Sequence, residues 1–217
     1  VGAAIGLVVV GGAIKVFVDL FTNNRRQLVE VRLNQDLRAA ADIIARDLRR
    51  SGYWEGAATG VSQALVPNPF TNTNVTTVAA NEVGYSYDRD RNGARDATAE
   101  QAGFQLNGNV IRMLVGGAWQ PLTDPATVQV TNFFVENNAS AEQVVSRAAF
   151  CPCVSSSGPS RCDPAVVDTL PNRPLMVIRY VDIVIEGRAT NDNAMTRQVR
   201  ESVRLRNDEV RGVCPPP

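Results

Sequence analysis

The hydrophobic pattern of the chain changes character within its first fifty residues. Residues 1–14 carry no polar side chain, and apolar residues continue past Lys15 to Phe21. From about Arg25 onward, apolar residues recur at helical intervals of three or four, with charged residues between them. This stripe consists of Leu33, Leu37, Ala40, Ile44 and Leu48. Because no proline or glycine interrupts residues 13–51, the pattern predicts one continuous helix of about 50 residues, first apolar on all sides and then amphipathic.

We expect the first half of this helix to leave the domain, because no compact domain of this size needs a helix about 75 Å long. Its uncharged part spans roughly 21 Å, and a few more apolar residues upstream would complete a membrane-spanning segment of about 30 Å. The chain has no initiator methionine, which indicates a processed or incomplete N-terminus. A signal peptide and a buried core helix fit less well than a membrane-inserted helix. Glycines that permit close helix packing and local unwinding stand at Gly2, Gly6, Gly11 and Gly12.

The stretch ARDLRRSGYWE, residues 45–55, predicts where the amphipathic half ends. Gly52 is a suitable C-terminal cap, and the arginines of the last turn interact favourably with the helix dipole. Tyr53 and Trp54 are expected to anchor the exit loop on the domain. The chain then divides into a membrane-inserted half at residues 1–24, an amphipathic half at residues 25–54 and a head at residues 55–217.

The head is predicted to be rich in β-strands. A long polar connection reaches to about Asn81, and alternating or β-branched segments follow it. Strands are expected at residues 82–87, 103–106, 109–115, 126–136, 175–187 and 196–206. The second and third of these would form a hairpin across Asn107-Gly108 with a type I′ turn. The predicted fold class is therefore α+β, with an antiparallel sheet packed on the amphipathic half of the helix.

The loop YDRDRNGARD has the oxygen-rich pattern of the first half of a calcium-binding loop, with a glycine at the sharp turn. The candidate ligands are Asp88, Asp90, Asn92 and Asp96. The twelfth position is Ala99 where a bidentate glutamate is expected, and Glu100 comes one residue late. Two arginines within the loop partly neutralise its charge. The alternative is a solvated turn between two strands, rich in Asp and Asn.

All four cysteines lie in the last third of the chain, at Cys151, Cys153, Cys162 and Cys214. An even number in a segment rich in Pro and Ser predicts two disulfides in an oxidising compartment, stapling a surface loop at residues 137–174. A zinc site is the alternative, although this spacing lacks paired C-x-x-C motifs, and free thiols are a third reading. Three pairings are open. We expect one bond within residues 151–162 and another that ties Cys214 to the head.

The composition makes catalysis improbable. The chain has no histidine, which removes the commonest general base and rules out a Ser-His-Asp triad or a Cys-His pair. The only tight acidic pair in a loop, Asp88 and Asp90, is explained by turn chemistry. With 22 basic and 22 acidic residues, net charge gives no indication of a nucleic-acid partner. No C-x-x-C-H motif is present, so haem-based electron transfer is excluded, and no cofactor other than calcium is expected.

The chain resembles type IV pilins and pseudopilins, in which an apolar N-terminal helix becomes amphipathic and is followed by a β-rich head. The segment LRAAADIIARDLRRSGYW at residues 37–54 resembles the helix end of PilW-like minor pilins. Residues 119–136 and 199–208 resemble the middle segment and the last strand of that family. The family begins with an aromatic residue and a short apolar stretch that holds a glutamate at the fifth position. No residue here corresponds to that glutamate or to the family's N-methylated amine.

The resemblance implies a structural subunit of a pilus or pilus-like filament, in a minor role such as priming or at the tip. Its partners would be other pilin subunits, contacted through the N-terminal helix. It would sit in the bacterial inner membrane before assembly and in the extracellular filament afterwards. The alternatives are a major filament subunit and a membrane-tethered periplasmic binding module that never polymerises. The purpose of the filament, including adhesion, stays open.

Overall fold

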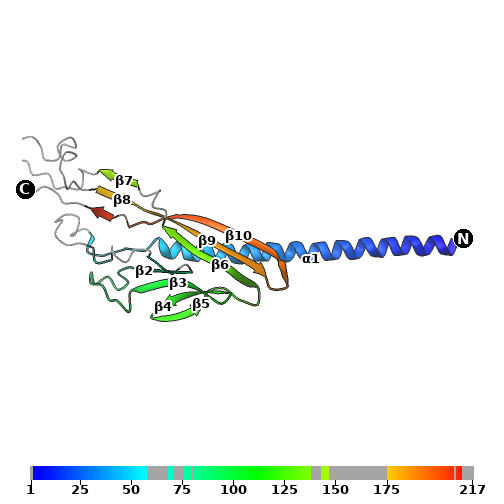
Figure 1. Ribbon diagram of the computed structural model, residues 1–217, viewed down its shortest axis with the longest axis horizontal. Coiled ribbons are helices and arrows are strands. Elements are labelled where there is room, and N and C mark those ends of the chain that lie inside the picture. Colours follow the sequence, from blue (N-terminus) through cyan, green and yellow to red (C-terminus); the bar gives the residue numbers. More distant parts are fainter. Residues whose placement is uncertain are drawn as a thin grey trace, which may run out of the picture.

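The computed structural model describes residues 2–57, 68–70, 76–79, 81–137, 143–146, 175–207 and 209–211. Figure 1 shows a β-rich head from which a single long helix projects toward the N-terminus. The described part is α+β, as predicted, with one long helix and three antiparallel sheets. The four cysteines, and with them the predicted disulfide-stapled loop, lie outside the described residues.

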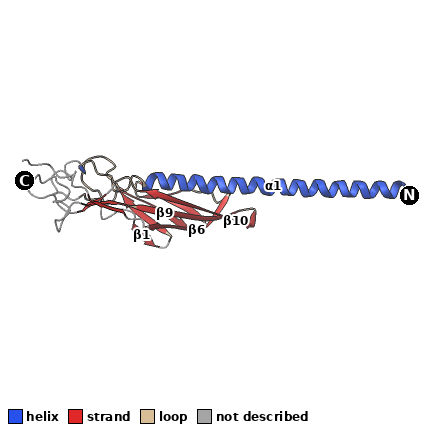
Figure 2. Ribbon diagram, turned by 90° about the horizontal axis from the view of Figure 1, so that it is seen from above, coloured by secondary structure: helices blue, strands red, loops and turns tan. Residues whose placement is uncertain are grey.

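Helix α1 (Gly2–Leu48) is continuous over 47 residues, which confirms the prediction of one long N-terminal helix. Only its C-terminal half lies along the head, and its N-terminal half extends beyond the sheets (Figure 2). The predicted apolar stripe is buried in the head, where none of its five residues is more than 4% exposed. The helix and the sheets therefore share one hydrophobic core, and the stripe is the contribution of α1 to that core.

The end of α1 is tighter than a regular helical turn. The N–H groups of Arg50 and Ser51 bond to carbonyls three residues earlier, which uses carbonyl groups that the helix end would otherwise leave free. Gly52 follows with a φ of 74°, in the left-handed region that glycine adopts readily. Its N–H donates a hydrogen bond to the carbonyl oxygen of Ser86 at 2.9 Å. Gly52 thus turns the chain from the helix onto the neighbouring sheet.

The first sheet has five antiparallel strands in sequence order. They are β1 (Thr76–Ala79), β2 (Glu82–Ser86), β3 (Gln101–Asn107), β4 (Val110–Val115) and β5 (Ala118–Pro121). The strands β1 and β5 were not expected from the sequence. Both lie at the edges of the sheet and are short, so neither shows a clear alternation of polar and apolar residues.

The hairpin between β3 and β4 differs from its prediction by one residue. Asn107 pairs with Val110, so the two turn residues are Gly108 and Asn109. Among the non-glycine residues that the structure describes, only Arg91 has a positive φ, and Gly108 has a φ of 63°. A positive φ at the first turn residue alone is typical of a type II′ turn, so the predicted type I′ turn was wrong.

The second sheet has the order β10-β9-β6 and packs against α1. Its strands are β6 (Val128–Asn137), β9 (Tyr180–Ala189) and β10 (Asp192–Arg204). A Cβ atom at Gly187 would lie 3.0 Å from Cδ2 of Leu37 and 3.1 Å from Cγ2 of Val128. The absence of a side chain at Gly187 therefore lets the helix approach the middle strand closely.

The third sheet is small, with the order β11-β8-β7. It consists of β7 (Gln143–Ser146), β8 (Leu175–Ile178) and β11 (Glu209–Arg211). The prediction of one strand over residues 175–187 was wrong, because β8 and β9 belong to different sheets and are separated by Arg179. The carbonyl of Arg179 instead accepts a hydrogen bond from the N–H of Leu205. Both segments are rich in β-branched residues, so propensity alone does not reveal the change of partner.

Candidate functional site

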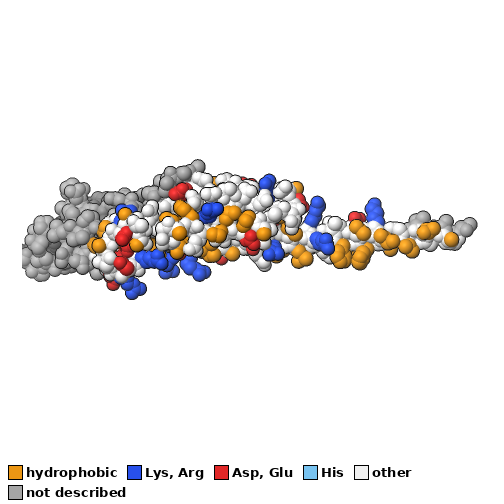
Figure 3. All heavy atoms as spheres, turned by 90° about the horizontal axis from the view of Figure 1, so that it is seen from below, with side chains coloured by type: hydrophobic (Ala, Val, Ile, Leu, Met, Phe, Trp, Pro, Cys, Tyr) orange, Lys and Arg blue, Asp and Glu red, His pale blue; other side chains and the backbone are white. Residues whose placement is uncertain are grey.

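The N-terminal half of α1 presents a long apolar surface. Its large apolar side chains range from 54% exposed at Val18 to 74% exposed at Leu7. The set comprises Leu7, Val9, Val10, Ile14, Val16, Phe17, Val18, Leu20 and Phe21, and the exposed Leu28 and Val31 extend it into the amphipathic half. Figure 3 shows apolar side chains gathered along this projecting segment. Because burying one such side chain stabilises a protein by about 1.5–3 kcal/mol, this surface is a strong candidate for burial in an assembly.

The four glycines of this half make no close contact within the chain. A Cβ atom placed at Gly2, Gly6, Gly11 or Gly12 would meet nothing within 4 Å. The helix runs unbroken through all four, so the local unwinding expected at Gly11 and Gly12 stays a prediction. Among the described residues, no helix is both long enough and apolar enough to cross a membrane.

Two ion pairs join α1 to the hairpin of β9 and β10 at the point where the helix leaves the head. Nε of Arg26 lies 3.8 Å from Oδ2 of Asp192, and the carboxylate of Glu30 pairs with the guanidinium of Arg197. These pairs link residues more than 150 positions apart, so no local sequence pattern indicates them. Because all four groups are partly exposed, each pair contributes at most about 1 kcal/mol to stability. They define the boundary between the packed half of the helix and the projecting half.

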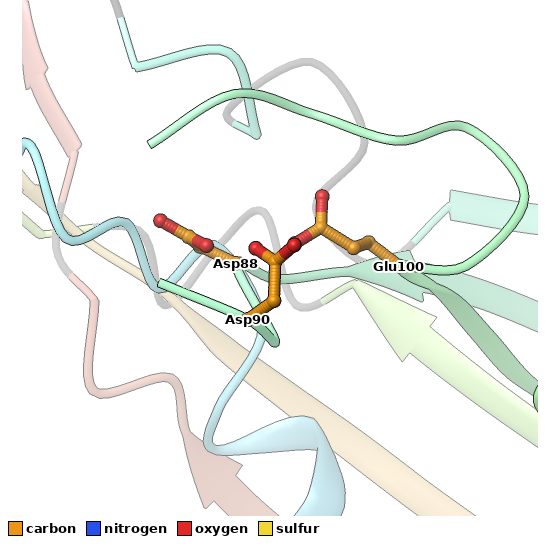
Figure 4. Close-up of side chains that lie close together, drawn as sticks. All are labelled: Asp88, Asp90 and Glu100. Atoms are coloured by element: carbon orange, nitrogen blue, oxygen red, sulfur yellow. The ribbon is translucent and has the colours of Figure 1, made fainter. Parts of the chain in front are cut away.

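The acidic loop between β2 and β3 brings three carboxylates together. One oxygen each of Asp88, Asp90 and Glu100 lies within 4.8 Å of the other two, and Figure 4 shows the three groups side by side. Asp88 is 1% exposed and Glu100 is 3% exposed, whereas Asp90 is exposed. Of the residues predicted as calcium ligands, the structure therefore places Asp88 and Asp90 in one cluster. It adds Glu100, the residue that the sequence pattern placed one position late.

Backbone N–H groups hold the two buried carboxylates in place. Oδ2 of Asp88 accepts hydrogen bonds from the N–H groups of Glu55 and Gly93, at 3.1 and 3.0 Å. Glu100 accepts one from Arg89 through Oε1 and one from Asp96 through Oε2, both at 2.8 Å. Oδ1 of Asp88 is buried and has no hydrogen-bond partner. The two carboxylates thus organise the backbone of the loop, and one buried oxygen is left over.

The other two predicted ligands shape the turns of the loop. The side chain of Asn92 donates to Oδ2 of Asp90 and accepts from the N–H of Ala94, both at 2.7 Å. Oδ1 of Asp96 accepts from the N–H groups of Thr98 and Ala99. Those two hydrogen bonds lower the pKa of Asp96 below its ordinary value. Asp96 does not belong to the three-carboxylate cluster.

The acidic loop is also fastened to the end of α1. The indole Nε1 of Trp54 donates a hydrogen bond to the carbonyl oxygen of Gly93 at 2.8 Å. The N–H of Asp88 donates to the carbonyl of Tyr53 at 2.9 Å. The prediction that the exit loop is anchored on the domain is therefore confirmed for the side chain of Trp54, whereas Tyr53 contributes its backbone carbonyl and its hydroxyl pairs with Glu55 at the surface.

The comparison with known families shows which family the chain belongs to. The model of the family PpdB, prepilin peptidase-dependent protein B, matches residues 26–205, which is most of the chain. The chain belongs to the prepilin peptidase-dependent protein B family. No curated protein and no solved structure matches it. The prediction of a type IV pilin-related family of structural proteins is confirmed at this level, whereas the match does not single out PilW-like proteins.

A groove of about 530 Å³ lies between the end of α1 and the first sheet. Its charged and aromatic groups bond to one another across the two elements. The hydroxyl of Tyr85 donates to Oδ2 of Asp47 at 3.0 Å. Arg50 pairs with Asp47 and lies over the ring of Tyr87, 5.0 Å from its centroid. In this member of the family, the groove is thus a polar junction between helix and sheet.

Proposed function

We propose that this protein is a minor pilin-like structural subunit of a type IV pilus or related filament, with a priming or tip role. The family match supports a pilus-related role. The resemblance of residues 37–54 to PilW-like proteins favours the minor role over that of a bulk shaft subunit. The partners of the protein in this proposal are other pilin subunits, contacted through α1.

The continuity of α1 is the observation that carries the proposal. One continuous helix has its C-terminal half packed on the head and its N-terminal half exposed as an apolar segment. A helix that merely tethered a head to a membrane would not need to run unbroken into the core of that head. In a filament, the same continuity fixes the direction of the head relative to the packed helices.

The proposed mechanism is an exchange of apolar surroundings. The projecting half, residues 1–24, would lie in the inner membrane before assembly and move into the filament core, where other helices replace lipid. Since lipid tails and helix surfaces are similarly apolar, the exchange costs little free energy, which suits a reversible polymer. The four glycines support this step, because a Cβ atom at any of them would meet nothing within 4 Å among the described residues, which leaves room for a neighbouring helix to approach.

Two alternatives make different predictions. A membrane-tethered periplasmic module would use the apolar helix only as an anchor, so it would stay in the membrane fraction. A major subunit would occur along the whole shaft at high stoichiometry. Mass spectrometry of sheared filaments, combined with electron microscopy of cells that lack the gene, separates the three. A minor subunit is expected in trace amounts, and filaments are expected to be lost without it.

A pair of variants tests the role of the helix directly. Gly11→Leu keeps the segment apolar, and a Cβ atom at this position would meet nothing within 4 Å among the described residues, so the head and the anchor are expected to be unaffected. It would block the close approach of a neighbouring helix, and we expect filaments to decrease at least tenfold while the membrane-associated protein stays constant. Gly11→Ala is the matched control, because alanine is also small enough for close helix packing, and it should assemble normally. Normal filaments with Gly11→Leu would contradict packing at this glycine.

A further inference from the structure

We propose that Asp88, Asp90 and Glu100 form a calcium site at the end of the head where α1 terminates. This set shares two residues with the pattern seen in the sequence, and it replaces Asn92 and Asp96 by Glu100. The three ligands come from two places in the chain, the turn after β2 and the residue before β3 (Figure 4).

The first argument is the balance of charge. Asp88 and Glu100 are almost completely buried and, together with Asp90, place three carboxylates within 4.8 Å. Like charges at this distance in a desolvated site repel one another strongly, and burial adds a desolvation cost for each ion. Among the described residues, no lysine or arginine pairs with any of the three. A bound divalent cation would supply the missing positive charge.

The second argument is an unused oxygen. Oδ1 of Asp88 is buried without a hydrogen-bond partner, although most buried polar atoms in folded proteins have one. Its sister atom Oδ2 is fixed by two backbone N–H groups, so the carboxylate cannot turn away without breaking them. Its carboxyl group lies beside those of Asp90 and Glu100 (Figure 4). An anionic oxygen held in this way is a preorganised cation ligand.

The donor set selects the kind of cation. All three candidate ligands are carboxylate oxygens, which favour hard cations over the transition metals that prefer nitrogen or sulfur. Calcium accepts six to eight oxygens in irregular geometry, whereas magnesium demands a regular octahedron. The exposed Asp90 leaves one side of the cluster open to solvent, so water can complete the coordination shell and the ion has a path of entry.

Calcium at this site would stiffen the junction of helix and sheet. Asp88 bonds to the N–H of Glu55 just after α1, and Gly93 in the same loop holds the indole of Trp54. An ion that joins Asp88 to Glu100 would therefore fasten the helix exit to the start of β3.

Thermal unfolding of the full chain in detergent micelles, in buffered sodium chloride with either calcium or a chelator, tests the site. We expect calcium to raise the Tm of the wild type by about 5 °C. Asp90→Asn removes an exposed ligand and is expected to weaken calcium binding at least tenfold in calorimetry. Asp96→Asn is the matched control, because it removes the same charge from the same loop but lies outside the cluster.

The outcomes separate the explanations. Loss of binding in Asp90→Asn and normal binding in Asp96→Asn would support the cluster. Equal losses in both variants would overturn it in favour of the ligand set indicated by the sequence or of a diffuse acidic loop. An equal rise in the Tm of the wild type with magnesium at the same concentration would contradict the choice of calcium as the ion. If calcium does not change the Tm or bind the wild type, the proposal fails, while the filament proposal is unaffected.

Discussion

The indole nitrogen of Trp54 donates a hydrogen bond to the carbonyl oxygen of Gly93, which lies 39 residues further along the chain. This bond connects the exit loop that follows α1 to the acidic loop. Trp54 is itself buried, and the close contact of its ring with Gly56 leaves no space for a side chain there. The end of the helix and the loop thus form one structural unit.

Trp54→Phe should therefore destabilise the head. The variant loses the hydrogen bond to Gly93 and part of the buried ring, and we expect the free energy of unfolding to fall by about 1–2 kcal/mol. Urea denaturation of the detergent-solubilised chain measures this change. Tyr53→Phe is the control. It removes a hydroxyl that pairs with Glu55 at the surface, so it should lower the free energy of unfolding by less than about 0.5 kcal/mol. Equal effects of the two variants would show that the bond does not fasten the loop.

Gly103→Ala should strain the first sheet. A Cβ atom at this position would lie 2.7 Å from the carbonyl oxygen of Val83 on the neighbouring strand, so the two backbones must separate. We expect a loss of about 1–3 kcal/mol in the free energy of unfolding, measured as above. In Gly6→Ala the new methyl group meets nothing within the chain, and helix propensity favours alanine. A neutral result for Gly103→Ala would mean that β2 and β3 adjust without cost.

Adjacent isoleucines on α1 provide a test of the amphipathic half. Ile44 is 0% exposed and Ile43 is 40% exposed, so the same substitution acts on a buried and on an exposed position of one helix. Ile44→Ala is expected to lower the free energy of unfolding by about 2–5 kcal/mol, because it leaves a cavity in the shared core. Ile43→Ala is expected to lower it by less than about 1 kcal/mol. Thermal unfolding of both variants gives the comparison. Similar losses would contradict the packing of this face against β9 and β10.

The helix and its buried face could be predicted from the sequence because the controlling interactions are local. Periodicity alone identified Leu37 and Ile44 as core residues, and both are completely buried. The boundary between β8 and β9 could not be predicted, because it depends on which strands pair and not on the residues of the segment. Glu100 was missed as a cluster member for a related reason. The sequence template requires a fixed spacing, whereas the structure brings Glu100 back through its bonds to Arg89 and Asp96.

Alkaline pH should destabilise the junction at Tyr85. Burial raises the pKa of Tyr85 above its ordinary value of 10.0, and the charge and the hydrogen bond of Asp47 raise it further. Below pH 10 the hydroxyl is neutral in both the folded and the unfolded chain. Above that pH the unfolded chain releases the proton and the folded chain retains it, so stability falls by up to about 1.4 kcal/mol per pH unit.

Tyr85→Phe tests this origin of the pH dependence. At neutral pH the variant should be less stable by about 1–3 kcal/mol, because it loses the bond to the carboxylate of Asp47. Above pH 10 the difference in the free energy of unfolding between the wild type and the variant should shrink with each pH unit. The wild type loses stability there, whereas the variant has no proton to release at this position. Urea denaturation of both proteins between neutral pH and pH ~11 measures the difference. A constant difference across that range would assign the alkaline sensitivity to other groups.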